Sequence, residues 1–211
     1  MSKLDDYPKF IRAGYSLREL IAAFIRLKVL SAVWTRVKYP LRRRGARVCI
    51  DLTADIAGAK YIEIDDDSWV QRYAWLTVPL IAMPAVENRT YLSIGKRVQL
   101  GRNTFIGAAN SVRVDDDVLV APRVTITDHS YRFEDPTRLI KEQGMTEGGF
   151  VKVGRGCLIG AGAALLGHRG LTIGEQVVIG ANAVVTTDVP PRCVVVGNPA
   201  RIIKRLDDGR P

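Results

Sequence analysis

The chain has 211 residues, 7% aromatic residues and 19 glycines, which favours strands with tight corners and a core of small, branched side chains. Three cysteines without metal-ligand spacing indicate thiols in a reducing compartment, and no apolar run is suited to a secretory signal or a bilayer-spanning helix. The formal net charge of +9 calls for an anionic partner, and nucleic acid, an anionic membrane and a phosphorylated small molecule all satisfy it.

Residues 1–45 carry the pattern of a helix. Ser16 with Glu19 three residues later forms a capping-box signature, and the helical spacing continues to Pro40. Two placements stay open for this segment: packed on the rest of the molecule or on a neighbouring subunit, or resting on an anionic membrane as a basic amphipathic element. The apolar stripe comprises Leu17, Leu20, Ile21, Phe24, Leu27, Leu30, Val33, Trp34 and Val37.

From residue 50 onward, an aliphatic residue recurs every six positions, and the positions group into triplets. Seventeen of the eighteen slots hold Ile, Leu or Val, and Arg44 occupies the remaining one. We expect Gly or Asp after the aliphatic residue to ease each bend. The residue four positions after a slot should also point inward. The slots are Arg44, Ile50, Ile56; Ile64, Val70, Leu76; Ile94, Leu100, Ile106; Val114, Val120, Ile126; Val153, Ile159, Leu165; and Ile173, Ile179, Val185.

The spacing between triplets places every insertion at one corner. The steps from the last slot of one triplet to the first of the next are 8, 18, 8, 27 and 8 residues. A triangular coil with three flat sides explains this pattern, because only one of its vertices then accepts extra residues. The sequence therefore predicts an all-β parallel β-helix over residues 46–200, with insertions at about 77–92 and 127–152 and a basic tail at 201–211.

The two histidines of the chain share one phase of the repeat. His129 lies three residues after Ile126, and His168 lies three residues after Leu165 in the next coil. Both should therefore lie near the vertex from which the long insertion departs. Long loops that leave a rigid scaffold commonly carry function.

The stretch VGRGCLIGAGAALLGHRGLTIGEQVVIGANAVVTTDVPPRCVVVGNPARIIK resembles the hexapeptide-repeat acyltransferases, and the resemblance covers about residues 46–204. It implies the left hand of the β-helix, which the spacing does not reveal. In that family the prisms associate as trimers, and each active site lies in a cleft between two subunits. A homotrimer is accordingly expected.

The stretch TDHSYRF resembles the Asp-His-Ser-His motif of the sugar O-acetyltransferase branch of this family. The resemblance implies that His129 is the general base. Tyr131 replaces the second histidine of the motif, so no role for that histidine carries over. Asp128 is expected to orient or polarise His129, and Tyr131 and His168 are expected to line the acceptor site.

The resemblance also implies where acetyl-CoA binds. Its pantetheine arm is expected near Ala161, Ala181 and the turn at Thr186. In the motif GNPARIIK, the residues Arg201 and Lys204 are expected to meet the CoA phosphates, since guanidinium and ammonium groups suit phosphate. Cys157 falls on an inward position and is interpreted as core.

The sequence thus predicts an acetyl-CoA-dependent O-acetyltransferase that acts on a sugar hydroxyl in cell-surface polysaccharide biosynthesis, with a sugar or lipid-linked glycan as acceptor. Two alternatives stay open: an N-acyltransferase for an amino sugar, and a non-catalytic β-helix scaffold. No metal is expected, because a zinc site with three histidine ligands needs more histidines than the two in this chain. Nucleic acid is disfavoured, since no aromatic and basic stacking pattern appears. We expect a cytoplasmic protein, with a peripheral membrane contact through the N-terminal helix left open.

Overall fold

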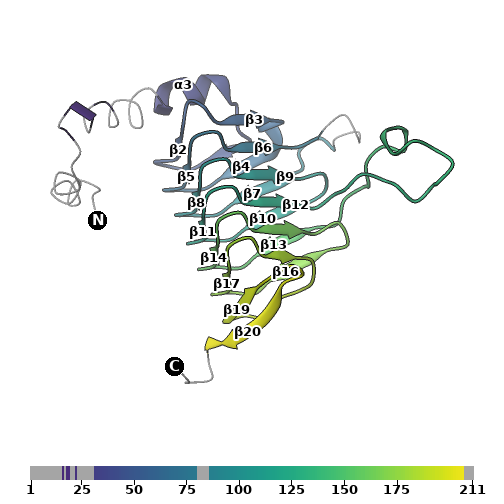
Figure 1. The fold of residues 1–211 in the computed structure, drawn as a ribbon. Coiled ribbons are helices and arrows are strands. Elements are labelled where there is room, and N and C mark those ends of the chain that lie inside the picture. The colour runs from purple at the N-terminus through teal and green to yellow at the C-terminus, as the bar shows by residue number, and fades with distance from the viewer. Residues whose placement is uncertain (1–15, 17, 20–21, 23–30, 80–85, 207–211) are drawn as a thin grey trace.

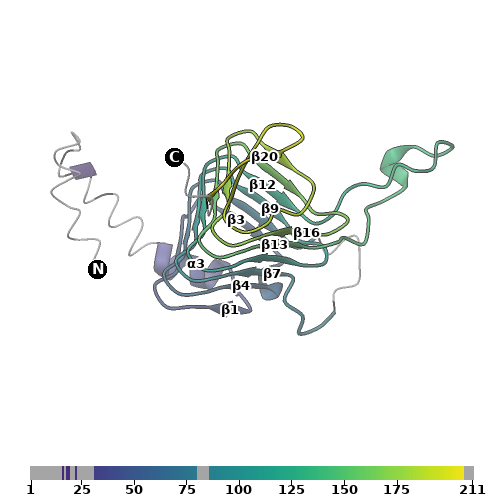
Figure 2. The same ribbon diagram turned by 90° about the horizontal axis from the view of Figure 1, so that it is seen from below.

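The computed structural model describes residues 16, 18–19, 22, 31–79 and 86–206, and it shows a stack of triangular coils (Figures 1 and 2). Three sheets, here named A, B and C, form the sides of the prism. Neighbouring strands within each sheet pair in parallel and in register, apart from one antiparallel strand at the C-terminal end. The predicted parallel β-helix is confirmed.

The strands are two to five residues long, as six-residue sides require. Sheet A contains β1 (Arg43–Arg44), β4 (Ile62–Ile64), β7 (Leu92–Ile94), β10 (Val112–Val114), β13 (Val151–Val153) and β16 (Leu171–Ile173). Sheet B contains β2 (Cys49–Ile50), β5 (Trp69–Val70), β8 (Gln99–Leu100), β11 (Leu119–Val120), β14 (Leu158–Ile159), β17 (Val178–Ile179), β19 (Cys193–Val196) and β20 (Arg201–Arg205). Sheet C contains β3 (Asp55–Ala57), β6 (Trp75–Thr77), β9 (Phe105–Gly107), β12 (Thr125–Thr127), β15 (Ala164–Leu166) and β18 (Val184–Val185).

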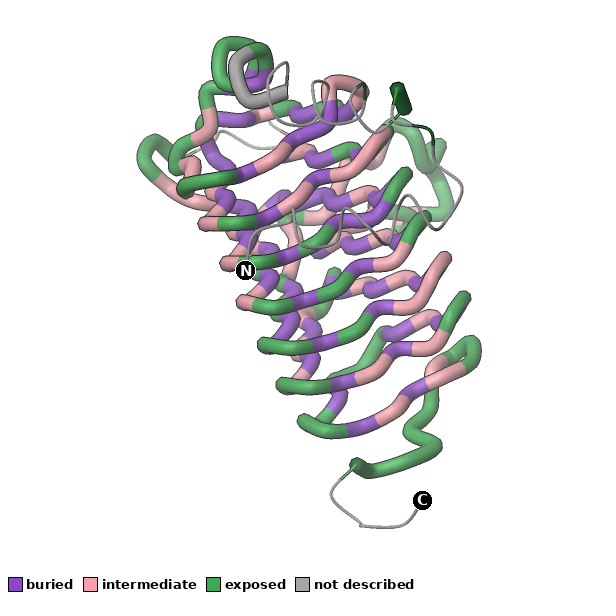
Figure 3. Tube along the Cα trace, turned by 90° about the vertical axis from the view of Figure 1, so that its left-hand side faces the viewer, coloured by how far each residue is buried: buried purple, intermediate pink, exposed green. Residues whose placement is uncertain are grey.

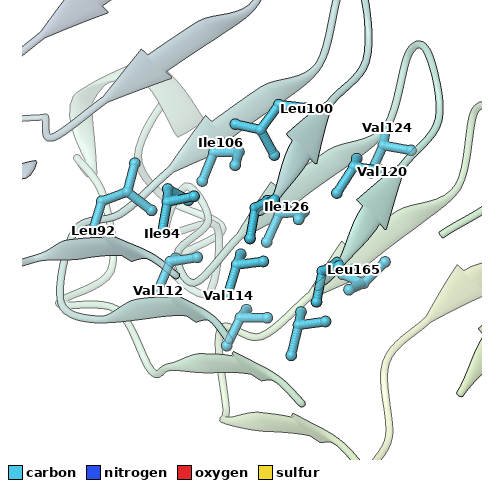
Figure 4. Packing of buried hydrophobic residues seen from close by; sticks show 14 of the residues in the cluster. Leu92, Ile94, Leu100, Ile106, Val112, Val114, Val120, Val124, Ile126 and Leu165 are labelled. Atoms are coloured by element: carbon cyan, nitrogen blue, oxygen red, sulfur yellow. The ribbon is translucent and has the colours of Figure 1, made fainter. Parts of the chain in front are cut away.

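The core is a set of aliphatic columns that run along the prism. All seventeen aliphatic slots of the repeat are buried, and so are the residues four positions after the first and second slots of each triplet. Register pairs such as Ile94 with Val114 and Ile126 with Leu165 stack like residues on like (Figure 4). Buried and exposed positions alternate along every coil (Figure 3). Burial of apolar surface in these columns is the main stabilising term.

The tight corners are turned by a different residue from the one we expected. The third residue after the first or second slot of a triplet generally has a left-handed backbone, as at Arg97 (φ 56°) and Asn103 (φ 55°). The glycine directly after a slot instead makes room for the next coil. A Cβ at Gly101 would lie 2.6 Å from the carbonyl carbon of Ala121. The expectation that this glycine eases the bend is therefore wrong at this position, where close approach is the reason for it.

The helix α3 (Ser31–Lys38) covers the N-terminal end of the prism (Figure 1). Thr35 is fully buried, and the Tyr39 hydroxyl donates a hydrogen bond of 2.7 Å to the Ala54 carbonyl. Farther upstream, the backbone N–H of Ser16 bonds the Glu19 carboxylate at 2.7 Å and the N–H of Glu19 bonds the Ser16 hydroxyl at 3.3 Å, so the predicted capping box is present. These bonds lower the pKa of Glu19.

Two residues of the predicted apolar stripe, Trp34 and Val37, have described side chains, and both are exposed. Trp34 is 57% exposed and Val37 is 78% exposed, because α3 turns Thr35 toward the prism instead. The remaining stripe residues lie outside the described residues or have side chains outside them. No helix within the described ranges is long and apolar enough to cross a membrane.

Both ends of the β-helix differ from the expected boundaries. Strand β1 already pairs with β4, so the first coil begins at Arg43, before residue 46. Residues 201–205 form β20, which pairs antiparallel with β19 through a β-bulge, so the start of the expected tail is a strand. The short 3-10 helices η2 (Ala59–Tyr61) and η3 (Ile140–Glu142) lie in segments that connect sheet C to sheet A.

The corner between sheets C and A, here called the C–A corner, carries the insertions. Residues 78–91 connect β6 to β7, and residues 80–85 of this segment lie outside the described ranges. Residues 128–150 connect β12 to β13 and project from the prism as a long arm (Figure 2). The chain leaves the prism where the triplet spacing predicted.

Candidate functional site

Asp128, the first residue after β12, is fully buried at the C–A corner. Its carboxylate accepts three backbone N–H hydrogen bonds from the turn that follows β9. Ala109 donates to Oδ1 at 2.8 Å, Asn110 to Oδ2 at 2.8 Å and Ser111 to Oδ2 at 2.6 Å. Such charge-assisted bonds are about twice as strong as neutral ones, so they fix the position of the carboxylate.

His129 is held by this carboxylate. Its Nδ1 lies 2.9 Å from Asp128 Oδ1 and 3.2 Å from the Thr127 hydroxyl, and its side chain is 10% exposed. An ionised carboxylate only accepts, so the proton of a neutral imidazole must lie on Nδ1. Nε2 then carries a lone pair and is the basic nitrogen of the ring. The predicted orientation of His129 by Asp128 matches this geometry.

Gly107 forms the surface beneath the imidazole. A Cβ at this position would lie 2.9 Å from His129 Cε1 and 3.0 Å from Phe105 Cζ. Phe105 in turn contacts Trp75 of the previous coil, with ring centroids 4.8 Å apart. The ring of His129 therefore has a defined place only because the residue below it lacks a side chain.

Asn110 joins three segments that are far apart in the sequence. Its Nδ2 donates to the Gly149 carbonyl at 2.7 Å, at the end of the long arm. The guanidinium of Arg89, from the shorter insertion, donates to the Asn110 carbonyl at 3.0 Å and also contacts its side-chain oxygen. The carbonyl of Asp128 accepts from the Gly149 N–H at 2.7 Å. Both insertions are thus tied to the turn that holds Asp128.

Sequence reasoning missed Arg89 and Asn110. Neither residue occupies a repeat slot, so the six-residue period places no constraint on either of them. The available signal was their position, since both lie in segments that pass through the corner where the insertions occur.

Tyr131 and His168 are both exposed. Tyr131, 62% exposed, lies on the arm and makes an isolated β-bridge with Met145. His168 lies in the turn from Gly167 to Gly170, at the same corner as His129. Its backbone adjoins the end of the arm, since a Cβ at Gly149 would lie 2.9 Å from the His168 carbonyl carbon. The expected shared corner is confirmed, while both roles stay predictions.

The residues expected to bind acetyl-CoA lie along the later coils. Ala161 and Ala181 lie on successive turns between sheets B and C, where the Asn182 N–H bonds the Ala161 carbonyl at 2.9 Å. Thr186 is exposed directly after β18. Arg201 and Lys204 are exposed cations on β20, which suits a phosphate-bearing group.

The Cys157 thiol and the metal-ligating side chains are the other groups to consider for chemistry. Burial raises the pKa of the Cys157 thiol to about 11, which makes it a poor nucleophile and fits its predicted place in the core. Among the residues that the structure describes, no three His, Cys, Asp or Glu side chains gather into a group that could hold a metal ion.

Comparison with known proteins finds the same repeat and fold. A family model described as the hexapeptide repeat of succinyl-transferase matches residues 150–187 and 170–198. Galactoside O-acetyltransferase of Escherichia coli K12 is 33% identical over 131 residues, which cover 58% of this chain and 61% of that protein. WbbJ of the same strain, provisionally assigned as a lipopolysaccharide biosynthesis O-acetyl transferase, is 32% identical over 56% of this chain and 63% of its own length.

A solved structure shares the architecture. AntD, an N-acyltransferase from Bacillus cereus in complex with dTDP and 3-hydroxybutyryl-CoA, matches with a TM-score of 0.66 at 17% identity. The match covers 85% of this chain and 89% of AntD. The expected left-handed β-helix is confirmed by this likeness together with the repeat. The chain matches less than two thirds of the length of the two curated relatives.

Proposed function

From its similarity to the hexapeptide-repeat acyltransferases, we propose that the chain is a member of that family and an acetyl-CoA-dependent O-acetyltransferase for a sugar hydroxyl. One observation carries the proposal: the buried Asp128 carboxylate binds Nδ1 of His129 at 2.9 Å and leaves Nε2 as a base at the corner where the arm departs. A scaffold would have no need of a buried carboxylate that fixes the tautomer of a histidine.

In the proposed reaction, Nε2 of His129 removes the proton of the sugar hydroxyl as its oxygen attacks the thioester carbonyl carbon. The new C–O bond forms while the carbonyl π electrons move to oxygen and give a tetrahedral oxyanion. Collapse of this intermediate breaks the C–S bond, and the imidazolium returns its proton to the CoA sulfur. Asp128 stabilises the transient positive charge of the ring through the Nδ1 hydrogen bond.

The donor and the acceptor are supported by the relatives. AntD carries an acyl-CoA on the same fold, and both curated relatives are named for O-acetyl transfer. The exposed cations Arg201 and Lys204 would meet the CoA phosphates, and Ala161, Ala181 and Thr186 would lie along its pantetheine arm. The relation to WbbJ favours a unit of a cell-surface polysaccharide as the acceptor.

The proposal includes a homotrimer, because His129 lies at an outward corner of the prism and one prism provides only one wall of a site. A neighbouring prism would supply the opposite wall of the site and bring its own later coils to the CoA. The exposed apolar side chains of the arm are suited to such a contact, and they include Phe133, Leu139, Ile140 and Phe150.

The test is a screen of sugar acceptors for acetyl-CoA-dependent acetylation, read by mass spectrometry of the product. A hydroxyl acceptor should give a product that hydroxylamine cleaves, because an ester reacts and an amide does not. Products resistant to hydroxylamine, formed only from amino sugars, would support the N-acyltransferase alternative that AntD suggests. Acetylation of no sugar above the rate of the acceptor-free control would refute the proposal.

A further inference from the structure

Arg44 is the one exception in the aliphatic slots of the repeat. It pairs in register with Ile64, and the first slots of the later coils hold Ile or Val. Its half-buried guanidinium lies beneath α3, where Nη2 donates to the Thr35 hydroxyl at 3.0 Å and to the Val48 carbonyl at 3.2 Å. Nη1 is buried and has no hydrogen-bond partner within the described part of the chain. An unpaired buried donor on a charged group is costly, so Arg44 lowers the stability of this coil relative to an aliphatic residue.

The neighbouring arginines form ion pairs with carboxylates, whereas Arg44 forms no ion pair among the described residues. Carboxylates of the second coil pair with three of them: Arg42 with Glu63 at 3.2 Å, Arg43 with Asp65 at 2.6 Å and Arg47 with Asp67 at 2.6 Å.

The positive charge of a second arginine, Arg36, acts on the Arg44 guanidinium. Burial first, and then the charge of Arg36, lower its pKa. Both side chains line the same pocket, and neither forms an ion pair with a carboxylate among the described residues.

A pocket opens between these two arginines. It has a volume of about 240 Å³ and is lined by Arg36, Tyr39, Pro40, Leu41 and Arg44. The Lys38 ammonium lies 4.8 Å from the centroid of the Tyr39 ring and adds positive charge nearby. One water molecule occupies about 30 Å³ of liquid, so the pocket is large enough for a tetrahedral oxyanion.

We propose that this pocket at the N-terminal end of the prism binds a phosphate group, with the guanidinium groups of Arg44 and Arg36 as its donors. Arginine binds phosphate oxygens through its planar fork, and a phosphate between two guanidinium groups offsets the repulsion between them. The site lies at the end of the prism opposite β20, where Arg201 and Lys204 lie (Figure 1). It does not depend on the acetyltransferase proposal. A small phosphate compound and a phospholipid headgroup share this chemistry.

The test uses the full chain with two probes: inorganic phosphate, and phosphatidylcholine vesicles with or without phosphatidic acid. Arg44→Leu restores the aliphatic residue of the other coils, so its thermal midpoint without phosphate should not fall. Arg44→Leu and Arg36→Gln should each weaken phosphate binding about tenfold or more, since a hydrogen bond to a charged group contributes about 1.5–3 kcal/mol. Arg47→Gln, which removes a paired arginine outside the pocket, is the matched control and should bind as the parent does.

The two probes separate the sources of the phosphate. Binding of free phosphate that depends on Arg44 supports a small phosphate compound, and binding only to phosphatidic acid vesicles with the same dependence supports a headgroup. The proposal is overturned if neither probe binds, or if Arg47→Gln weakens binding as much as Arg44→Leu does. Should Arg44→Leu fail to fold, Arg36→Gln decides, because the exposed Arg36 side chain can be replaced without disturbing the core.

Discussion

The corner between sheets A and B, here called the A–B corner, and the C–A corner are built from the same coil and differ in what they do with charge. The A–B corner takes no insertion, and its charged residues pair in the open, as Arg47 does with Asp67 and Arg97 with Asp117. The C–A corner takes both insertions and buries the Asp128 carboxylate under backbone N–H groups. The C–A corner thus holds a buried charge on backbone donors, whereas the ion pairs of the A–B corner lie in contact with water.

Removing the proposed base from the C–A corner should have the largest effect on activity. His129→Ala should lower acetyl transfer by roughly 10²–10⁴-fold, the usual range for a positioned general base. The affinity for acetyl-CoA, measured by calorimetry, should stay unchanged because the expected CoA contacts lie on other residues. His168→Ala is the matched variant at the same corner and should mainly raise the KM for the acceptor. Equal losses of kcat in both variants would contradict the assignment of the base.

Replacing the buried carboxylate should have the next largest effect. Asp128→Asn places an amide against three backbone N–H groups and weakens the Nδ1 bond. The loss of one charge-assisted bond, about 1.5–3 kcal/mol, corresponds to roughly a 10–100-fold lower kcat. The KM for acetyl-CoA should not change. The thermal midpoint should also fall, because the backbone donors of Ala109, Asn110 and Ser111 lose part of their acceptor.

A methyl group beneath the imidazole tests how strictly the corner positions its base. Gly107→Ala puts a Cβ 2.9 Å from His129 Cε1, so the ring must shift by a few tenths of an ångström. Small displacements of catalytic groups are costly, and we expect about a tenfold lower kcat. Thr77→Ala, at the register position of Gly107 in the previous coil, is the control and should leave kcat within error. Unchanged turnover in Gly107→Ala would mean that the ring position does not matter.

The A–B corner should give the smallest effect. Arg97→Gln removes the exposed pair with Asp117, and such pairs contribute little to stability. The hydrogen bond from Arg97 lowers the pKa of Asp117 below its ordinary value of 3.8, so the pair persists at pH 4 and is lost only at lower pH. Melting curves at pH 7 and pH 4 should therefore differ little between Arg97→Gln and the parent, and acetyl transfer should be the same. Loss of activity would show that this corner takes part in the reaction.

The fold could be predicted because a six-residue period allows few other structures. An aliphatic residue at each of Ile94, Leu100 and Ile106 must face one axis, and the register pairs follow from stacking such triplets. The corner with His129 could be located for the same reason, since the insertions interrupt the spacing at one phase only.

The contacts within the site could not be predicted from the period. Neighbours in a strand point to opposite faces, so the contact of Asp128 with His129 depends on the chain leaving β12 at Thr127. Asn110 meets Arg89 because the shorter insertion returns to the prism beside the turn after β9, which the period does not predict. Trp34 and Val37 are exposed because α3 packs through Thr35, whose small hydroxyl side chain reaches Arg44, and the apolar spacing alone does not predict this.

The central claim is that the Asp128–His129 pair is the base of an acetyl-CoA-dependent transfer, and a crystal structure with coenzyme A tests it most directly. The account predicts that the CoA sulfur lies at the C–A corner, within hydrogen-bond reach of His129 Nε2 or one water molecule from it. It also predicts that the Asp128 to Nδ1 bond is kept. A sulfur bound at another corner, or an imidazole turned away from Asp128, would contradict it.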